Sequence, residues 1–168
     1  MITIRFLTEN NKKQYFSVLE IVEQNLENKN FWLPVSDEER KTFFDQSKIL
    51  QIGAFEGEKL VGALGLYIDE SVFGSAFEHL EIKNKTGVAK VGRAMVLPEF
   101  RRKKILHLMM QTALEKAKSL NFNCVFAIAH PQNIASCSYL KKIGFKALKT
   151  FTTPNGYLRN LYFLDNLN

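Results

Sequence analysis

The stretch Val96-Leu97-Pro98-Glu99-Phe100-Arg101-Arg102-Lys103-Lys104-Ile105-Leu106 joins a strand pattern to a long helical pattern and decides how the middle of the chain folds. Its four consecutive cations lie where the helix is predicted to begin. Helix dipoles place about half a positive charge at the N-terminus, so each cation there is unfavourable by about 0.3–1 kcal/mol. Free backbone N–H groups, the dipole and the cations together predict a site for a ligand with several phosphate groups. Charge alone leaves two alternatives open, a solvated basic turn and a nucleic-acid patch.

Length and composition predict one packed domain, residues 1–168. The chain has 168 residues, of which 46% are hydrophobic and 24% are charged, and its formal net charge is +6. This composition suits a single core and argues against disorder. No stretch approaches the roughly 18 apolar residues that span a bilayer, and the N-terminus has no signal-like region. The two cysteines lack metal-ligand spacing. We therefore expect a cytoplasmic protein with no membrane partner and no metal.

The patterns on either side of the cationic stretch predict strands and helices in alternation. Strands are expected over residues 2–7, 49–55, 60–67, 88–97, 124–129, 145–152 and 157–164. One helix should follow the caps at residues 8–11, and a capping box at Ser36 and Glu39 should open another that runs to about Ser47. Two more are expected from Ile105 to Leu120 and over residues 132–143. Residues 68–87 leave a short helix and a loop equally open.

A second pattern lies downstream, Asn133-x-x-Ser136-x-x-Tyr139-Leu140-x-Lys142-x-Gly144-Phe145. In this order, the two blocks resemble the GNAT superfamily of N-acetyltransferases. The first is similar to its Val-x-Pro strand end followed by Arg/Gln-x-x-Gly-x-Gly/Ala, and the second to its Asn-x-x-Ala/Ser and Lys-x-Gly-Phe segment. The resemblance implies an α/β (α+β) fold. Its mostly antiparallel sheet would have about seven strands, splayed between the fourth and fifth, with about four helices on both faces.

The resemblance also implies an acetyl-CoA-dependent N-acetyltransferase that acts on a primary amine of a small molecule or peptide by direct attack. The coenzyme A phosphates would contact Arg101, Arg102, Lys103, Lys104, Ile105 and Leu106. The thioester would lie beside main-chain groups of Met95, Val96 and Leu97, and the pantetheine arm beside Asn133 and Ser136. The family usually has small residues at the positions of Lys104 and Leu106, because glycine lets the backbone approach a pyrophosphate closely. We expect binding to be retained despite this departure.

The residues that transfer protons are less well defined by the sequence. The usual acid of the family is a tyrosine one position after Tyr139, where this chain has Leu140. Tyr139 is therefore the candidate acid, with packing or coenzyme A contact as its alternatives. Glu99, Glu78, Glu81 and His130 are candidate bases, and a solvent-exposed turn histidine is the alternative for His130. Arg93 would either pair with a carboxylate or meet an acidic substrate.

Two other functions remain to be weighed. The missing tyrosine and glycines motivate a module that binds acyl-CoA without turnover. Nucleic-acid binding is not expected, because no aromatic stacking pattern or reading helix accompanies the basic turn. The sequence leaves a homodimer open.

Overall fold

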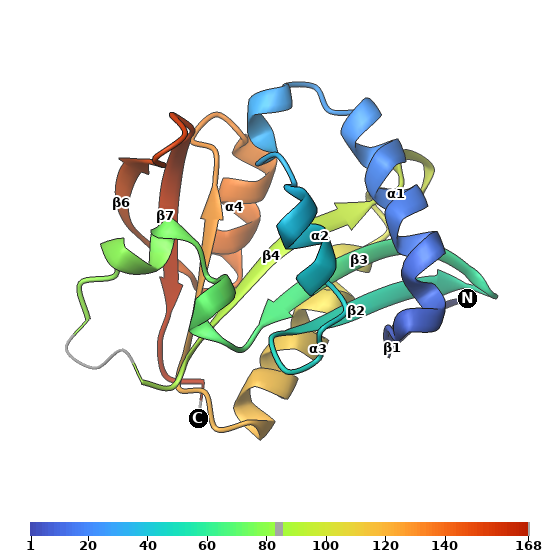
Figure 1. Cartoon of the computed structure of the whole chain (residues 1–168), viewed down its shortest axis with the longest axis horizontal. Helices are drawn as coiled ribbons and strands as arrows, with labels where there is room; N and C mark the ends of the chain where they lie inside the picture. The colour runs from blue at the N-terminus through green and yellow to red at the C-terminus, as the bar shows by residue number, and fades with distance from the viewer. Residues whose placement is uncertain (83–85, 168) are drawn as a thin grey trace.

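A seven-stranded sheet forms the middle layer of the computed structural model, which describes residues 1–82 and 86–167 (Figure 1). The strand order is β1-β2-β3-β4-β5-β7-β6. The strands are β1 Ile2–Phe6, β2 Ile49–Glu56, β3 Lys59–Tyr67, β4 Val88–Val96, β5 Cys124–Ala129, β6 Lys146–Thr152 and β7 Leu158–Leu164. β4 and β5 are parallel and the other neighbouring pairs are antiparallel, which confirms the predicted mixed sheet.

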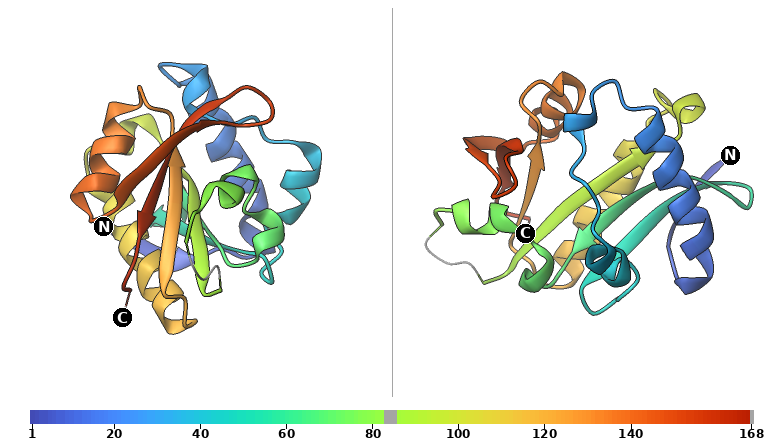
Figure 2. Two further views of the ribbon diagram at one scale, coloured as in Figure 1. Left: turned by 90° about the vertical axis from the view of Figure 1, so that its left-hand side faces the viewer. Right: turned by 45° about the horizontal axis from the view of Figure 1, so that its top comes forward.

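Helices cover both faces of the sheet (Figure 2). Helices α1 Lys12–Gln24 and α2 Asp37–Thr42 lie on one face, and α3 Ile105–Ser119 and α4 Ile134–Lys142 lie on the other. Short 3-10 helices precede or connect them: η1 Glu9–Asn11, η2 Lys29–Phe31, η3 Glu70–Val72, η4 Ser75–His79 and η5 Pro98–Phe100. None of the helices in the described part of the chain has the length and apolarity needed to cross a bilayer.

The apolar stripes of the helices hold these layers together. Buried residues recur at helical spacing in α1, at Tyr15, Val18, Leu19 and Val22, and in α3, at Ile105, Met109, Met110, Ala113 and Ala117. Each large apolar side chain removed from water in this way contributes about 1.5–3 kcal/mol. The sheet and α3 therefore form a rigid support for the loop that joins them.

One expectation about the first half of the chain needs correction, and one question that the sequence left open has an answer. Helix α2 ends at Thr42 and does not continue to Ser47. The Asp45 carboxylate accepts hydrogen bonds from the backbone N–H and the hydroxyl of Ser47, so a local turn competes successfully with the helix. Within residues 68–87, the structure has two 3-10 helices, η3 and η4, while residues 83–85 lie outside the described residues.

The parallel pair β4–β5 is short, and this positions the site. β4 pairs with β5 only from Val88 to Lys90, opposite Cys124 to Phe126, although β4 continues to Val96. Beyond Lys90 the two strands diverge (Figure 1). A bulge accompanies the divergence, because the register with β3 shifts between the Met95 and Gly92 pairs and Arg93 has a φ of 51°. Bulges bend a strand and increase its twist, so the predicted splay between the fourth and fifth strands is confirmed.

Candidate functional site

The loop between β4 and α3 has a backbone suited to anion binding. Residues Arg102 and Lys104 have left-handed conformations, with φ of 65° and 60°. Left-handed residues in a turn direct neighbouring N–H groups to one side, which makes a concave anion site. Helix α3 begins directly afterwards at Ile105, and the N–H groups of its first turn have no partner within the helix. The loop therefore presents both main-chain donors and the positive end of a helix dipole.

The four cations of this loop, Arg101 to Lys104, are exposed, and none has a carboxylate partner within the described residues. Lys103 lies over the Phe100 ring, 4.7 Å from its centroid. The acid in the loop, Glu99, pairs with Lys59 on β3 at 3.4 Å. A hydrogen bond from its own backbone N–H holds the pKa of Glu99 below its ordinary value. The charge of the loop thus remains available to an external anion.

The two side chains at the positions where the family has small residues differ in their surroundings. Leu106 is half-buried and packs against the core, whereas Lys104 is exposed. The bulk of Leu106 is therefore directed into the protein rather than into solvent at the loop. A phosphate-bearing group fits this loop because amides, a helix N-terminus and unpaired cations converge there.

One of the predicted residues on α4, Tyr139, lies against the first turn of α3. Asn133 caps α4, and its Oδ1 accepts the N–H of Ser136 at 3.1 Å. The Tyr139 hydroxyl lies 3.4 Å from Nδ1 of His107, a residue of α3 that the sequence did not single out. Burial raises the pKa of Tyr139, so its phenol is protonated at neutral pH. Leu140 is buried, so the usual tyrosine position of the family points into the core.

Arg93 links the bulge of β4 to α2 on the opposite face of the sheet from α3. Its Nη2 donates to both carboxylate oxygens of Glu39, at 2.8 and 3.0 Å, and its Nη1 donates to the carbonyl of Leu33. Its guanidinium also lies 5.3 Å from the centre of the Trp32 ring. The segment between η2 and α2 therefore crosses the diverging strands (Figure 2). Of the two roles left open for Arg93, the structure shows the pairing with a carboxylate.

His130 follows β5 and is 8% exposed, so the solvent-exposed alternative for this residue is wrong. The N–H of Gln132 donates to its Nδ1 at 3.2 Å, and the Phe31 ring lies 5.4 Å away. Burial and, secondarily, the charge of Arg159 lower the pKa of His130. With Nδ1 accepting a hydrogen bond, neutral His130 carries its proton on Nε2 and offers no free lone pair for proton abstraction.

Several other polar groups on this face are buried. The side-chain atoms Tyr15 Oη, Trp32 Nε1, Gln51 Nε2 and Oε1, and Arg159 Nη2 lack a hydrogen-bond partner among the described residues. Lys90, at the end of the β4–β5 pairing, donates to the carbonyl of Phe73 at 2.8 Å, and burial lowers its pKa to about 8. Glu81, a further candidate base, pairs with Lys149. The face of the sheet that carries α1 and α2 thus contains several buried donors without a hydrogen-bond partner among the described residues.

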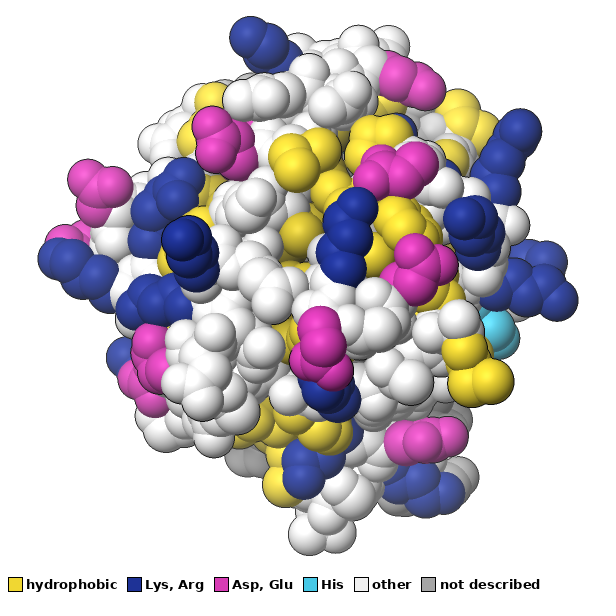
Figure 3. All heavy atoms as spheres, turned by 90° about the vertical axis from the view of Figure 1, so that its right-hand side faces the viewer, with side chains coloured by type: hydrophobic (Ala, Val, Ile, Leu, Met, Phe, Trp, Pro, Cys, Tyr) yellow, Lys and Arg dark blue, Asp and Glu magenta, His cyan; other side chains and the backbone are white. Residues whose placement is uncertain are grey.

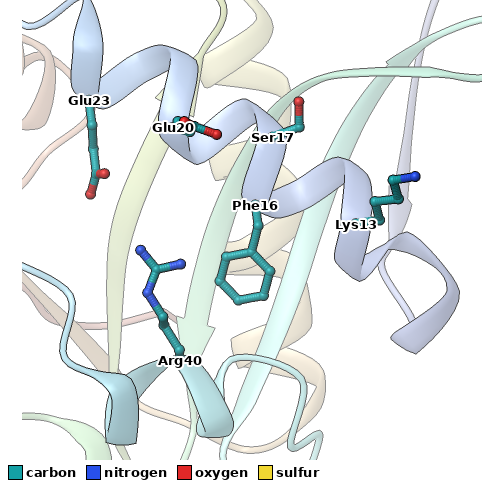
Figure 4. A pocket seen from close by; sticks show the side chains of 6 residues that line it. All are labelled: Lys13, Phe16, Ser17, Glu20, Glu23 and Arg40. Carbon is teal, nitrogen blue, oxygen red and sulfur yellow. The ribbon is translucent and has the colours of Figure 1, made fainter.

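Two surface features lie away from the cationic loop and the diverging strands. A hollow of about 490 Å³ between α1 and α2 is lined by Lys13, Phe16, Ser17, Glu20, Glu23 and Arg40 (Figure 4). Because none of these residues belongs to β4, β5 or α3, the hollow is separate from the cationic loop. On the side that carries α1 and the N-terminus, basic and acidic side chains are intermixed (Figure 3). The charge pairs Arg5–Glu58 and Lys12–Glu9 follow the same intermixed pattern.

Comparison with known proteins connects this geometry to a family. Residues 13–145 match the model of the acetyltransferase (GNAT) family. No curated protein sequence matches the chain.

Solved structures resemble the whole chain at low sequence identity. An N-acetyltransferase from Staphylococcus aureus is 17% identical with a TM-score of 0.74, covering 100% of this chain and 99% of its own. A PaiA N-acetyltransferase from Thermoplasma acidophilum, in complex with coenzyme A, is 19% identical with a TM-score of 0.68, covering 98% and 99%. The Arabidopsis thaliana NAA60, in complex with acetyl-CoA, is 12% identical with a TM-score of 0.75 and covers 98% of each chain.

Proposed function

Because the chain belongs to the GNAT family of acetyltransferases, we propose that it transfers an acetyl group from acetyl-CoA to a primary amine of a small molecule or peptide. The observation that carries the proposal is the loop at residues 101–106, where unpaired cations and left-handed residues precede the N-terminus of α3. Coenzyme A has a pyrophosphate and a further ribose phosphate, which suit such a set of donors. Arg101 to Leu106 are its proposed contacts.

Main-chain geometry supports a position for the thioester on β4. The N–H of Leu97 donates to the carbonyl of Val61 on β3. Polar groups of successive strand residues point to opposite sides, so those of Val96 point away from β3. The Val96 carbonyl indeed accepts a hydrogen bond from Arg101 Nε at 3.3 Å. Of the candidates Met95, Val96 and Leu97, Val96 therefore has the N–H best oriented to polarise a thioester carbonyl beside the diverging strands. A donor of this kind contributes about 3 kcal/mol to the transition state.

In the proposed reaction the amine nitrogen attacks the thioester carbonyl carbon. The C–N bond forms, the C–S bond breaks, the amine loses a proton to water, and the departing thiolate gains one. Tyr139 is the proposed acid because its protonated phenol lies between α3 and α4 and contacts His107. Glu99 and His130 fit the role of base less well, since Glu99 binds Lys59 and Nδ1 of His130 is occupied. Asn133 and Ser136 remain the proposed contacts of the pantetheine arm.

Two observations support the proposals that the protein is cytoplasmic and that it does not bind nucleic acid. Cys124 and Cys137 are buried and unpaired, which suits the reducing conditions of the cytoplasm. The loop at residues 101–106 is compact and local, whereas nucleic-acid binding through charge would favour a broader basic surface.

The experiment that tests the function measures coenzyme A binding and thiol release separately. Calorimetry should show binding of coenzyme A and much weaker binding of pantetheine, which lacks the phosphates. Free thiol should then appear from acetyl-CoA with at least one member of a panel of amines. Tyr139→Phe should lower this rate about 10-fold with unchanged coenzyme A affinity, because water can replace the phenol only in part.

Two outcomes would contradict this account. Binding of coenzyme A without thiol release for any amine would favour a module that binds acyl-CoA without turnover. No heat and no thermal shift with coenzyme A at about 1 mM would exclude the transferase, because affinity would then be too weak to use cellular acetyl-CoA.

A further inference from the structure

A buried arginine on β7 has no anionic partner within the described residues. Arg159 is 2% exposed. Its Nη1 donates to the carbonyl of the preceding residue, Leu158, at 2.6 Å, while its Nη2 is buried without an acceptor. A guanidinium remains charged at neutral pH, and removing it from water without an opposite charge is strongly unfavourable. An anion that reached Nη2 would offset this cost.

Strand alternation places Arg159 on the face of the sheet that carries α2. Asn160 and Tyr162 share the opposite face, where the Asn160 amide donates to the Tyr162 hydroxyl and Tyr162 lies against Cys137 of α4. Side chains one residue apart in a strand point to opposite faces, so Arg159 points away from α4. The last β5–β7 pair joins Ala129 to Asn160, so Arg159 lies beside His130, at the end where β4 and β5 have diverged.

The surroundings of Arg159 contain an excess of positive charge. Repulsion from Arg93 adds to burial in lowering the pKa of Arg159, so the two guanidinium groups are close enough to interact. Glu39 is the carboxylate of this group, and Arg93 occupies both of its oxygens. The two arginines and one carboxylate leave a net charge of +1, and Lys90, which interacts with the same Arg93 and Glu39 and has a pKa of about 8, adds further positive charge at neutral pH. The buried Nε1 of Trp32, beside Arg93, is a second donor without an acceptor.

Coenzyme A does not account for this charge. Its phosphates are assigned to the loop at residues 101–106, which precedes α3 on the other face of the sheet. The remainder of acetyl-CoA that would reach the diverging strands is the pantetheine arm and thioester, which are uncharged. An anion beside Arg159 must therefore arrive with the acceptor.

We propose that Arg159 binds a carboxylate of the acceptor, so that the substrate is a primary amine that also carries a carboxylate, such as an amino acid or a close derivative. This inference rests on the proposed acetyltransferase function and specifies its substrate class. A guanidinium matches a carboxylate in shape and charge. A purely structural arginine would instead leave the protein indifferent to the charge of the acceptor.

The single tryptophan of the chain, Trp32, provides a binding assay that does not require catalysis. N-acetyl-L-leucine and N-acetyl-L-phenylalanine have the composition of reaction products, and their C-terminal amides are matched uncharged controls. Tryptophan emission would be titrated with each compound, with and without coenzyme A. We expect the acids to cause a saturable change in tryptophan emission. The amides should bind at least about 10-fold more weakly, because they lose one charge-assisted contact. Equal responses to acids and amides, or no response to either, would overturn the proposal.

Two variants sharpen the test. Arg159→Met keeps a long apolar side chain and removes the charge, and it should abolish the preference for the acids while coenzyme A still binds. Arg5→Met is the control, since Arg5 lies on the edge strand β1 and pairs with Glu58. A preserved acid preference in Arg159→Met would overturn the proposal. If that variant does not fold, the matched acids and amides on the unmodified protein still decide.

The assay separates this inference from the proposed function. Thiol release that proceeds equally well with amino acids and their amides would overturn the role of Arg159 and leave the transferase intact. Absence of coenzyme A binding would instead contradict the transferase itself.

Discussion

Lys104 offers a direct test of the idea that the cationic loop is built for a bound anion. The residue has φ 60° and ψ 12° and immediately precedes α3. Both features oppose stability in the absence of a ligand, because a left-handed conformation costs a residue with a Cβ about 1–2 kcal/mol and a cation at a helix N-terminus about 0.3–1 kcal/mol. Replacing Lys104 by glycine and by alanine separates these two effects.

Both variants remove the charge, so each should gain about 0.3–1 kcal/mol in free energy of unfolding without ligand. Lys104→Gly also removes the Cβ and so relieves the left-handed strain of about 1–2 kcal/mol. About 0.4–1 kcal/mol of this stabilisation is lost again because glycine makes the unfolded chain more flexible. We therefore expect Lys104→Gly to exceed Lys104→Ala by about 0.5–1 kcal/mol. For a chain of this length, about 1 kcal/mol corresponds to roughly 2–4 °C in Tm.

Coenzyme A binding should change in the opposite direction. Both variants lose one cation from the phosphate site, so calorimetry should show about 5- to 10-fold weaker binding for each. The control is Lys118→Ala in the last turn of the same helix, where a cation is favourable and its removal should slightly lower Tm. Equal stability of the glycine and alanine variants would refute the strain argument, and unchanged coenzyme A affinity in both would refute the role of Lys104 in binding.

Two further changes test the opposite face of the sheet. Glu39→Gln should lower the free energy of unfolding by about 2 kcal/mol, or roughly 4–8 °C in Tm, because it leaves the mostly buried Arg93 without its carboxylate. Glu38→Gln is its control, because the exposed Glu38–Lys41 pair should contribute under about 0.5 kcal/mol. An equal loss of free energy of unfolding in the two variants would contradict a special role for Glu39. Burial lowers the pKa of Lys90 to about 8 from its ordinary value of 10.5. Between these pH values the unfolded chain holds a proton that the folded chain has lost, so the free energy of unfolding should rise with pH. Lys90→Met should lack this rise when Tm is measured from pH 8 to pH 10, and an unaltered pH dependence would show that Lys90 is not its source.

The fold could be predicted because its signals are local. The cations after Pro98, the stripe of α3 and the glycine that follows α4 each depend on neighbouring residues, and the structure has these elements close to their predicted bounds. The error at α2 has a local cause as well. Asp45 and Ser47 form a turn whose hydrogen bonds a helical periodicity does not reveal.

The acceptor side could not be predicted in the same way, because its contacts join distant parts of the sequence. Arg93 and Glu39 are 54 residues apart, and nothing in either neighbourhood specifies the other. His107 meets Tyr139 only because α3 and α4 pack on the same face. One signal was present for Arg159, since a lone cation inside the apolar strand pattern of residues 157–164 is unusual for a side chain that is rarely buried unpaired.

The bulge at Arg93 connects the two halves of the proposed mechanism. It bends β4 away from β5 after Lys90, which separates the strands where the thioester is proposed to lie. The same left-handed residue directs its guanidinium to Glu39 and thereby fixes the segment that carries Trp32 over the diverging strands. Because that pair consumes the local carboxylate, the charge of Arg159 remains unbalanced on this face. The divergence of β4 and β5 and the unbalanced charge that we propose binds the acceptor carboxylate are thus both connected to Arg93.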